Sequence, residues 1–358
     1  MLQSLPGKKE EKTMKNRILF ASLALSLLLS AFVMVSGCGS AASSGGGGGG
    51  GSVGTAWIYV GNYDDSTISY IDSTNDAVAS IELGTYTPYQ LAASPDGKHV
   101  YGRTSGAGGD ILVINTSTNT VESMFTAGDP HPYDKMAVSN DGNYLYVTRV
   151  NDSDLVKMNV ASGACVPVCT FEAAPRALIL NPDSTKAYVA LYDNCLADVT
   201  LNTGSFTTYE VGNSWNETQS IAIKDNKVYV PASTTVTVFD TNLHTTNLIT
   251  SDAQWLFTIT SIPGKDKLYT PNWLVAGEMR VINSTVPTFE STVITGATFS
   301  RPTFLCPTVD GNYVYVYDPS PTYHTQICKV NTNNDSIEAF TQVGSGEDWY
   351  NNPVIVYK

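Results

Sequence analysis

A short strand-like stretch built around one tyrosine recurs seven times along this chain. Successive copies lie 42, 45, 42, 41, 40 and 46 residues apart. This interval is typical of the four-stranded blades of a β-propeller and is longer than the period of most helical repeats. The repeat therefore predicts seven similar units, and it constrains the fold more than any other feature of the sequence. The tyrosines are Tyr59, Tyr101, Tyr146, Tyr188, Tyr229, Tyr269 and Tyr315.

Two kinds of turn signal accompany the tyrosines. A second strand-like run ends in Asp or Asn 11 to 16 residues later, where an Asx side chain can bond the backbone two residues on. These positions are Asp72, Asn115, Asn159, Asn202, Asp240, Asn283 and Asn331. Hairpin-type turns precede the tyrosine, at Ser94–Gly97, Ser139–Gly142, Asn181–Ser184 and Val309–Gly311, with Lys224–Asn226 and Pro263–Asp266 in the divergent units. Each unit thus predicts four strands, and the chain an all-β, seven-bladed propeller of four-stranded blades.

The units resemble the YVTN family of WD40-like β-propeller repeats. The first unit carries the resemblance best, with Tyr59-Val60-Gly61-Asn62, Ile71-Asp72 and Ser94-Pro95-Asp96-Gly97. The similarity extends over residues 57 to 358. It implies a propeller domain over that whole range, but the fold does not fix the function.

The two ends of the repeat region predict how the ring closes. The first unit begins at its second strand, Trp57–Val60, and the chain ends on an unpaired strand pattern, Pro353–Tyr357. If the C-terminal run becomes the innermost strand of blade one, neither sheet edge stays open. We therefore expect the C-terminal strand to complete blade one.

Residues 1–37 have the pattern of a lipoprotein signal peptide. Lys15 and Arg17 precede an apolar run, Ile18–Val35, and Met14 is the expected true start. The run ends in Val35-Ser36-Gly37-Cys38, which looks like a lipobox and predicts acylation of the Cys38 thiol. A transmembrane anchor is the alternative, because the apolar run nearly spans a bilayer.

Residues 38–56 are expected to form a tether. They contain seven consecutive glycines, Gly45–Gly51, and a flexible coil of this length reaches about 25 Å. Acyl chains on Cys38 would then hold the propeller at a membrane. Gly39 differs from the Asp that retains lipoproteins in the inner membrane, so the outer membrane is favoured in a Gram-negative source.

The charge of the chain excludes one class of partner. The net charge is −13, and residues 38–358 alone hold 15 basic and 31 acidic groups, or −16. Such a surface repels phosphate backbones, so nucleic-acid binding is not expected. The later cysteines lack the Cys-x-x-Cys spacing of haem or thioredoxin-like sites, and buried thiols are expected at Cys165, Cys169, Cys195, Cys306 and Cys328. Disulfides are the alternative in an exported protein, although five cysteines cannot all pair.

Propeller topology divides the loops between two faces. Generic turns lie on one face. The loops between second and third strands lie on the other face together with the crossovers between blades, and this face is here named the crossover face. Arginine and aromatic residues gather in the crossover-face segments, where guanidinium groups suit anions and rings offer stacking surfaces. The predicted ligand-binding residues are Arg103, Arg149, Arg176, Arg301, Trp215, Trp255, Trp349, Tyr133 and His131. The alternative is structural: arginines paired with carboxylates of the next blade, and tryptophans packed between blades.

Catalytic signals are weak. The crossover face holds His131, His324 and several carboxylates, Asp134, Glu217 and Asp348 among them, but no spacing indicates a metal site or hydrolytic triad. No cofactor is predicted, apart from a calcium ion at Asp64-Asp65 as an alternative to a surface turn. The favoured function is a binding module for a protein, peptide or glycan. The alternatives are a hydrolase or lactonase using a metal in the central channel, and a structural or adhesion protein.

Overall fold

The computed structural model describes residues 55–105, 110–212, 218–250, 252–253, 255–273, 277–296, 301–320, 324–345 and 353–357. The chain divides into two units, residues 1–33 and 34–358, and every described residue belongs to the second. The predicted signal peptide, Cys38 and residues 38–54 of the tether lie outside the described residues. The described segments contain no helix with the length and hydropathy needed for a membrane crossing.

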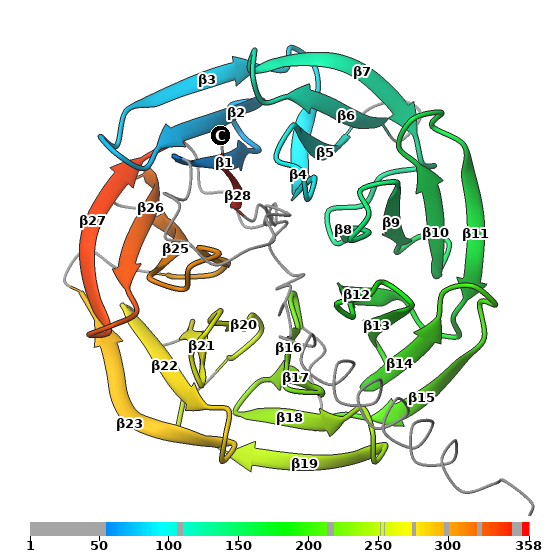
Figure 1. Cartoon of the computed structure of the whole chain (residues 1–358), viewed down its shortest axis with the longest axis vertical. Coiled ribbons are helices and arrows are strands. Elements are labelled where there is room, and N and C mark those ends of the chain that lie inside the picture. Colours follow the sequence, from blue (N-terminus) through cyan, green and yellow to red (C-terminus); the bar gives the residue numbers. More distant parts are fainter. Residues whose placement is uncertain are drawn as a thin grey trace, which may run out of the picture. The chain divides into compact units, whose positions relative to one another are not determined.

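The described strands form seven four-stranded antiparallel sheets arranged in a ring (Figure 1), which confirms the predicted fold. Blade one contains β28 (Val354–Tyr357), β1 (Ala56–Asn62), β2 (Thr67–Asp72) and β3 (Val78–Glu82). Blade two contains β4 (Thr87–Ala93), β5 (His99–Ser105), β6 (Asp110–Asn115) and β7 (Thr120–Thr126). Blade three contains β8 (Met136–Val138), β9 (Tyr144–Arg149), β10 (Asp154–Asn159) and β11 (Cys165–Thr170). Blade four contains β12 (Pro175–Leu180), β13 (Lys186–Leu191), β14 (Cys195–Thr200) and β15 (Phe206–Glu210).

The other three blades follow the same order from the centre outward. Blade five contains β16 (Ala222–Lys224), β17 (Lys227–Ala232), β18 (Thr235–Asp240) and β19 (Thr245–Thr250). Blade six contains β20 (Thr260–Ser261), β21 (Lys267–Asn272), β22 (Glu278–Asn283) and β23 (Thr288–Thr295). Blade seven contains β24 (Leu305–Pro307), β25 (Tyr313–Ser320), β26 (His324–Asn331) and β27 (Ser336–Gln342).

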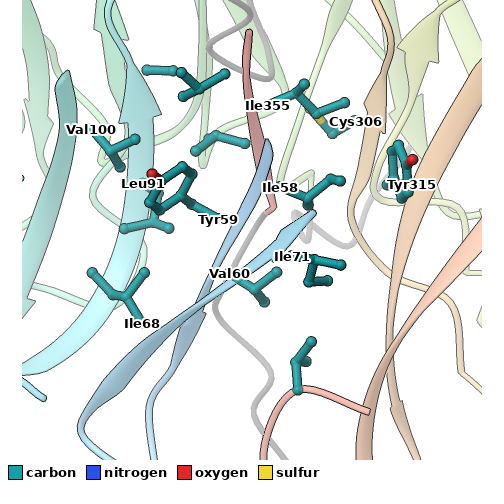
Figure 2. Close-up of a cluster of buried hydrophobic side chains, with 14 of the residues drawn as sticks. Ile58, Tyr59, Val60, Ile68, Ile71, Leu91, Val100, Cys306, Tyr315 and Ile355 are labelled. Carbon is teal, nitrogen blue, oxygen red and sulfur yellow. The ribbon is translucent and has the colours of Figure 1, made fainter. Parts of the chain in front are cut away.

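The ring closes as predicted. Strand β28 pairs antiparallel with β1, with Tyr357 opposite Ala56 and Ile355 opposite Ile58. In Figure 2, Ile355 lies beside Ile58 and Cys306 between blades one and seven, while Tyr59 and Leu91 meet on the side of blade two. The C-terminal strand therefore completes blade one and fills the space between its neighbours.

Burial decreases from the inner strands to the outermost one in each blade. In blade five the second strand has four consecutive buried residues, whereas five of the six residues of its outer strand β19 are exposed. Neighbouring blades pack face to face, because side chains on both faces of the inner strands are apolar. Cys165 is exposed on outer strand β11, and Cys169 and Cys195 are only partly buried, so the expectation of buried thiols is wrong for these three, whereas Cys328 is buried.

The repeated tyrosine connects each blade to the next. All seven are buried in the second strand of their blade. The Tyr59 hydroxyl contacts Asn119 Oδ1 at 2.5 Å, in the outer turn of blade two. Tyr229 donates to Ser284 O of blade six at 3.4 Å, and Tyr269 donates to Asp335 of blade seven. The tyrosine and the Asx turn thus recur together because one blade supplies the hydroxyl and the next supplies the acceptor.

The turns have the predicted geometry with one exception. Gly97, Gly142 and Gly311 adopt φ values of 71°, 71° and 65°, in the left-handed region that glycine tolerates. Six of the seven Asx residues end their strand and accept a hydrogen bond from the backbone two residues on. In blade four the strand ends at Thr200. The assignment of Asn202 as a strand end was therefore wrong.

Candidate functional site

The structure brings segments of the crossover face together. Asp65, between β1 and β2, accepts a hydrogen bond of 2.7 Å from Ser345 N, in the crossover that leads to blade one. The Arg149 side chain, at the end of β9, lies against Gly128 of the previous crossover, so that a Cβ there would stand 2.7 Å from Nη1. These contacts fix the loops between second and third strands against the crossovers.

Arg103 is an internal residue of this face. It lies in β5 and is completely buried, and its Nε and Nη2 contact Asp134 Oδ2 at 3.1 and 2.9 Å. Nη2 also donates to the carbonyl oxygens of Gly128 and Asp129, each at 3.1 Å. The geometry matches the structural alternative, in which an arginine holds a crossover, rather than a contact with ligand.

Asp134 is the acceptor that organises this crossover. It is completely buried, and besides Arg103 it accepts hydrogen bonds from His131 N at 3.0 Å and Val150 N at 2.9 Å. Burial raises the pKa of this carboxyl group, and the Arg103 guanidinium opposes the shift. The carboxylate therefore stabilises the loop and lacks a free face for chemistry.

Arg149 is also engaged by carboxylates. Its Nε and Nη2 contact Asp154 Oδ1 and Oδ2 at 2.9 and 2.5 Å, and Nη1 contacts Asp152 at 2.9 Å. The side chain is 22% exposed. This bidentate pair joins the ends of β9 and β10.

Arg176 has different surroundings. Its guanidinium carbon lies 4.5 Å from the ring centre of Tyr133 and 4.8 Å from that of Tyr192. Among the described residues, none makes an ion pair with it, and its Nε is buried without a hydrogen-bond partner. Arg176 is therefore a cation held by two aromatic faces, with donor capacity left for an anion.

His131 lies beside this pair of tyrosines. Its Nδ1 accepts a hydrogen bond of 3.2 Å from Tyr133 N, and its ring centre is 5.4 Å from the Tyr133 ring. Burial lowers the pKa of His131, Asp134 opposes the shift, and Arg176 adds to it. His131 thus shapes the turn that presents Tyr133.

Lys135 is a member of this site that the sequence interpretation missed. It follows Asp134 directly, is 4% exposed, and its Nζ donates to Gln219 Oε1 of the blade-five crossover at 3.2 Å. Nζ also lies 5.4 Å from the Phe304 ring centre, which belongs to blade seven. Burial lowers the pKa of Lys135 to about 7, with Asp134 opposing and Arg176 adding to the shift. The signal available in the sequence was its position at the entry to an inner strand, directly after an unusual crossover.

A second aromatic group lies between blades five and seven. Trp255 stacks on Trp273, with ring centres 5.1 Å apart and planes at 11°. The Arg301 guanidinium carbon lies 5.6 Å from the Trp273 ring, and its backbone N donates to Asp318 Oδ1 at 2.6 Å. Two of the predicted ligand-binding residues, Trp255 and Arg301, therefore belong to one group.

The remaining predicted residues divide into two sets. Trp215, Trp349, Glu217 and Asp348 lie outside the described residues, as does the side chain of His324. Asp65 is bound by Ser345, and a calcium ion at Asp64-Asp65 stays a prediction. The described part of the chain brings no three His, Cys, Asp or Glu side chains together as metal ligands.

Comparison with solved structures identifies the architecture. Kuenenia stuttgartiensis hydrazine synthase is similar with a TM-score of 0.60 and 13% sequence identity, and the match covers 72% of this chain and 87% of the hydrazine synthase chain. A chain of the mitotic checkpoint complex gives 0.60 at 10% identity, over 73% and 80% of the two chains. The dihydro-heme d1 dehydrogenase NirN, in complex with DHE, gives 0.56 at 13% identity, over 80% and 72%. The chain is a seven-bladed β-propeller. At these identities the likeness concerns the fold alone, and neither a family model nor a curated protein matches the sequence.

Proposed function

We propose that this propeller is a lipid-anchored extracytoplasmic binding module, similar to the YVTN repeat proteins, which binds an anionic ligand on its crossover face. The observation that carries the proposal is Arg176, the described crossover-face arginine that two aromatic rings hold and no described carboxylate neutralises. A chain with a net charge of −13 has carboxylates in excess. An arginine kept apart from them is suited to an anion from outside.

Lys135 supports the same site. Arg176 lowers the pKa of Lys135, which places the two cations within electrostatic reach of each other. An anion held by the Arg176 guanidinium would offset this repulsion. The arrangement suits a carboxylate, whose two oxygens match the guanidinium fork.

The Arg176→Gln substitution tests the proposal. The full chain, purified in detergent, is titrated calorimetrically with glucuronate, succinate and inorganic phosphate at constant ionic strength. We expect at least one of these anions to bind, and the substitution to weaken its binding at least about tenfold, since a charged hydrogen bond contributes about 1.5–3 kcal/mol. The control is Lys98→Gln, which removes one positive charge from the generic-turn face and should leave the affinity unchanged. Equal binding by both variants would refute the assignment to Arg176.

The same titration has a predicted pH dependence. The pKa of Lys135 is lowered to about 7 in the free protein, and a bound anion would raise it. Binding is then coupled to proton uptake, so the affinity should fall as pH rises above 7. Lys135→Met should remove this dependence.

The lipid anchor is proposed from the sequence at Val35-Ser36-Gly37-Cys38. Expressed as the full chain in a Gram-negative host, the wild type should partition with membranes and carry the added mass of acyl chains. Cys38→Ala should move to the soluble fraction or keep its apolar segment uncleaved, since the acylated thiol is lost. The matched control is Cys165→Ala, which removes an exposed thiol of the propeller. Acyl mass on the Cys38→Ala protein would contradict the proposal.

A further inference from the structure

The backbone of Trp255 is an outlier within the described residues. Twelve non-glycine residues have a positive φ, and eleven of them are Ser, Asp, Asn or His. Trp255 is the exception, with φ of 61°. This conformation is unusual for a bulky side chain, is strained, and is concentrated at functional positions. The adjacent backbone fixes it, because Leu256 N donates to Ser233 O of blade five at 2.7 Å.

The strained backbone presents an indole ring to solvent. Trp255 is 42% exposed, although Trp273 covers one of its faces in a nearly parallel stack. The exposed area must therefore lie on the opposite face and the ring edges. Behind it, Phe257 lies 5.8 Å from the Trp273 ring at an interplanar angle of 56°, and Arg301 lies 5.6 Å from that ring. The platform is thus rigid, since its supporting ring is held from several sides.

We propose that the open face of Trp255 binds a pyranose ring of a neutral glycan. The C–H face of an equatorially substituted sugar matches the negative face of an indole ring. Asp252, three residues earlier on the same crossover, is 81% exposed and contacts Arg280 Nη2 at 3.1 Å. The exposed carboxylate of Asp252, held by this ion pair, offers an acceptor for sugar hydroxyl groups beside the crossover.

The geometry favours a glycan over the other flat or extended ligands. A proline-rich peptide docks in a slot between aromatic rings, but Trp255 and Trp273 stack on each other and leave no space between their faces. The bases of a nucleic acid come with a phosphate backbone, which a protein of net charge −13 repels. A single exposed indole face instead suits one uncharged ring laid flat upon it.

This inference rests on the proposal that the crossover face binds ligands, and the variants separate the two. The full chain, in an amine-oxide detergent that carries no sugar, is titrated with cellohexaose and chitohexaose. We expect the wild type to bind one of them, Trp255→Asn to lose at least tenfold in affinity, and Trp255→Phe to retain part of it. Arg176→Gln should bind the glycan as the wild type does. Anion binding without glycan binding would refute this inference alone, and absence of both would refute both.

The melting temperature distinguishes a binding role from a structural one. Asparagine tolerates a positive φ, so Trp255→Asn should melt at or above the wild-type temperature while losing the glycan. A clear drop in its melting temperature, with glycan affinity retained in the folded fraction, would show that Trp255 serves packing. Binding of a hexaproline peptide at Trp255 in place of either glycan would also overturn the proposal.

Discussion

Removal of residues 353–358 should leave the propeller without a stable fold. Val354, Ile355 and Val356 are completely buried, and burying each such side chain contributes about 1.5–3 kcal/mol. Their loss is comparable with the whole net stability of a domain, about 5–15 kcal/mol. The truncation also removes the Tyr357 hydroxyl, which accepts a hydrogen bond of 2.8 Å from Val309 N of blade seven. We expect thermal unfolding monitored by circular dichroism to lose its cooperative transition, and gel filtration to show aggregates that associate through the open edge of β1.

A circular permutant is the matched control. Since Tyr357 lies opposite Ala56, a two-residue Asn-Gly turn can join β28 to β1 as a hairpin, with the new chain ending at Ser345. This permutant keeps every strand and should retain a cooperative transition. A truncated chain that melts cooperatively near the wild-type temperature would show that ring closure by β28 is dispensable.

The architecture was predictable because its signals are local and repeated. A tyrosine in one strand and an Asx residue at the end of the next recur with each blade. The tyrosine contacts the turn that follows the Asx residue of the neighbouring blade, as Tyr59 contacts Asn119 in the turn after Asn115. Ring closure followed from an unpaired strand pattern at the end of the chain. Only the strand end at Thr200 was misplaced, because a threonine stands where the other blades carry Asp or Asn.

The roles of the arginines were not predictable from the sequence. Arg103 and Asp134 are 31 residues apart, and no local pattern says that their blades bring them together in a buried pair. Arg176 has a similar sequence context but contacts two tyrosines and no described carboxylate. The residue types in the loops thus identified the crossover face as rich in arginine. Whether an arginine there pairs with a carboxylate or keeps its guanidinium donors for a ligand depends on long-range packing. The sequence also gives no signal for the positive φ of Trp255, because neither glycine nor asparagine stands at this position.

Because Arg103 pairs with a buried carboxylate, we expect a large loss of stability from Arg103→Met. The substitution leaves Asp134 completely buried with backbone N–H groups as its remaining described partners. Leaving a buried charge uncompensated costs about 3–5 kcal/mol. We expect urea denaturation at pH 7 to show a decrease of this size in the free energy of unfolding. Lys98→Met is the control: its ion pair with Asp96 is 75% exposed on the lysine side and 54% on the carboxylate side, and such pairs contribute about 1 kcal/mol or less.

A double-mutant cycle with Asp134→Asn tests whether the charge pair itself is responsible. Asparagine removes the negative charge and keeps an oxygen that can accept from Val150 N, which now bonds Oδ1 at 2.9 Å. The double variant should therefore be more stable than the sum of the two single losses predicts, by about 1–3 kcal/mol. Strict additivity, or a loss in Arg103→Met no greater than that in Lys98→Met, would contradict the assignment. The crossover from Gly128 to Lys135 would then owe its conformation to the backbone hydrogen bonds, and Arg103 would act mainly by filling space.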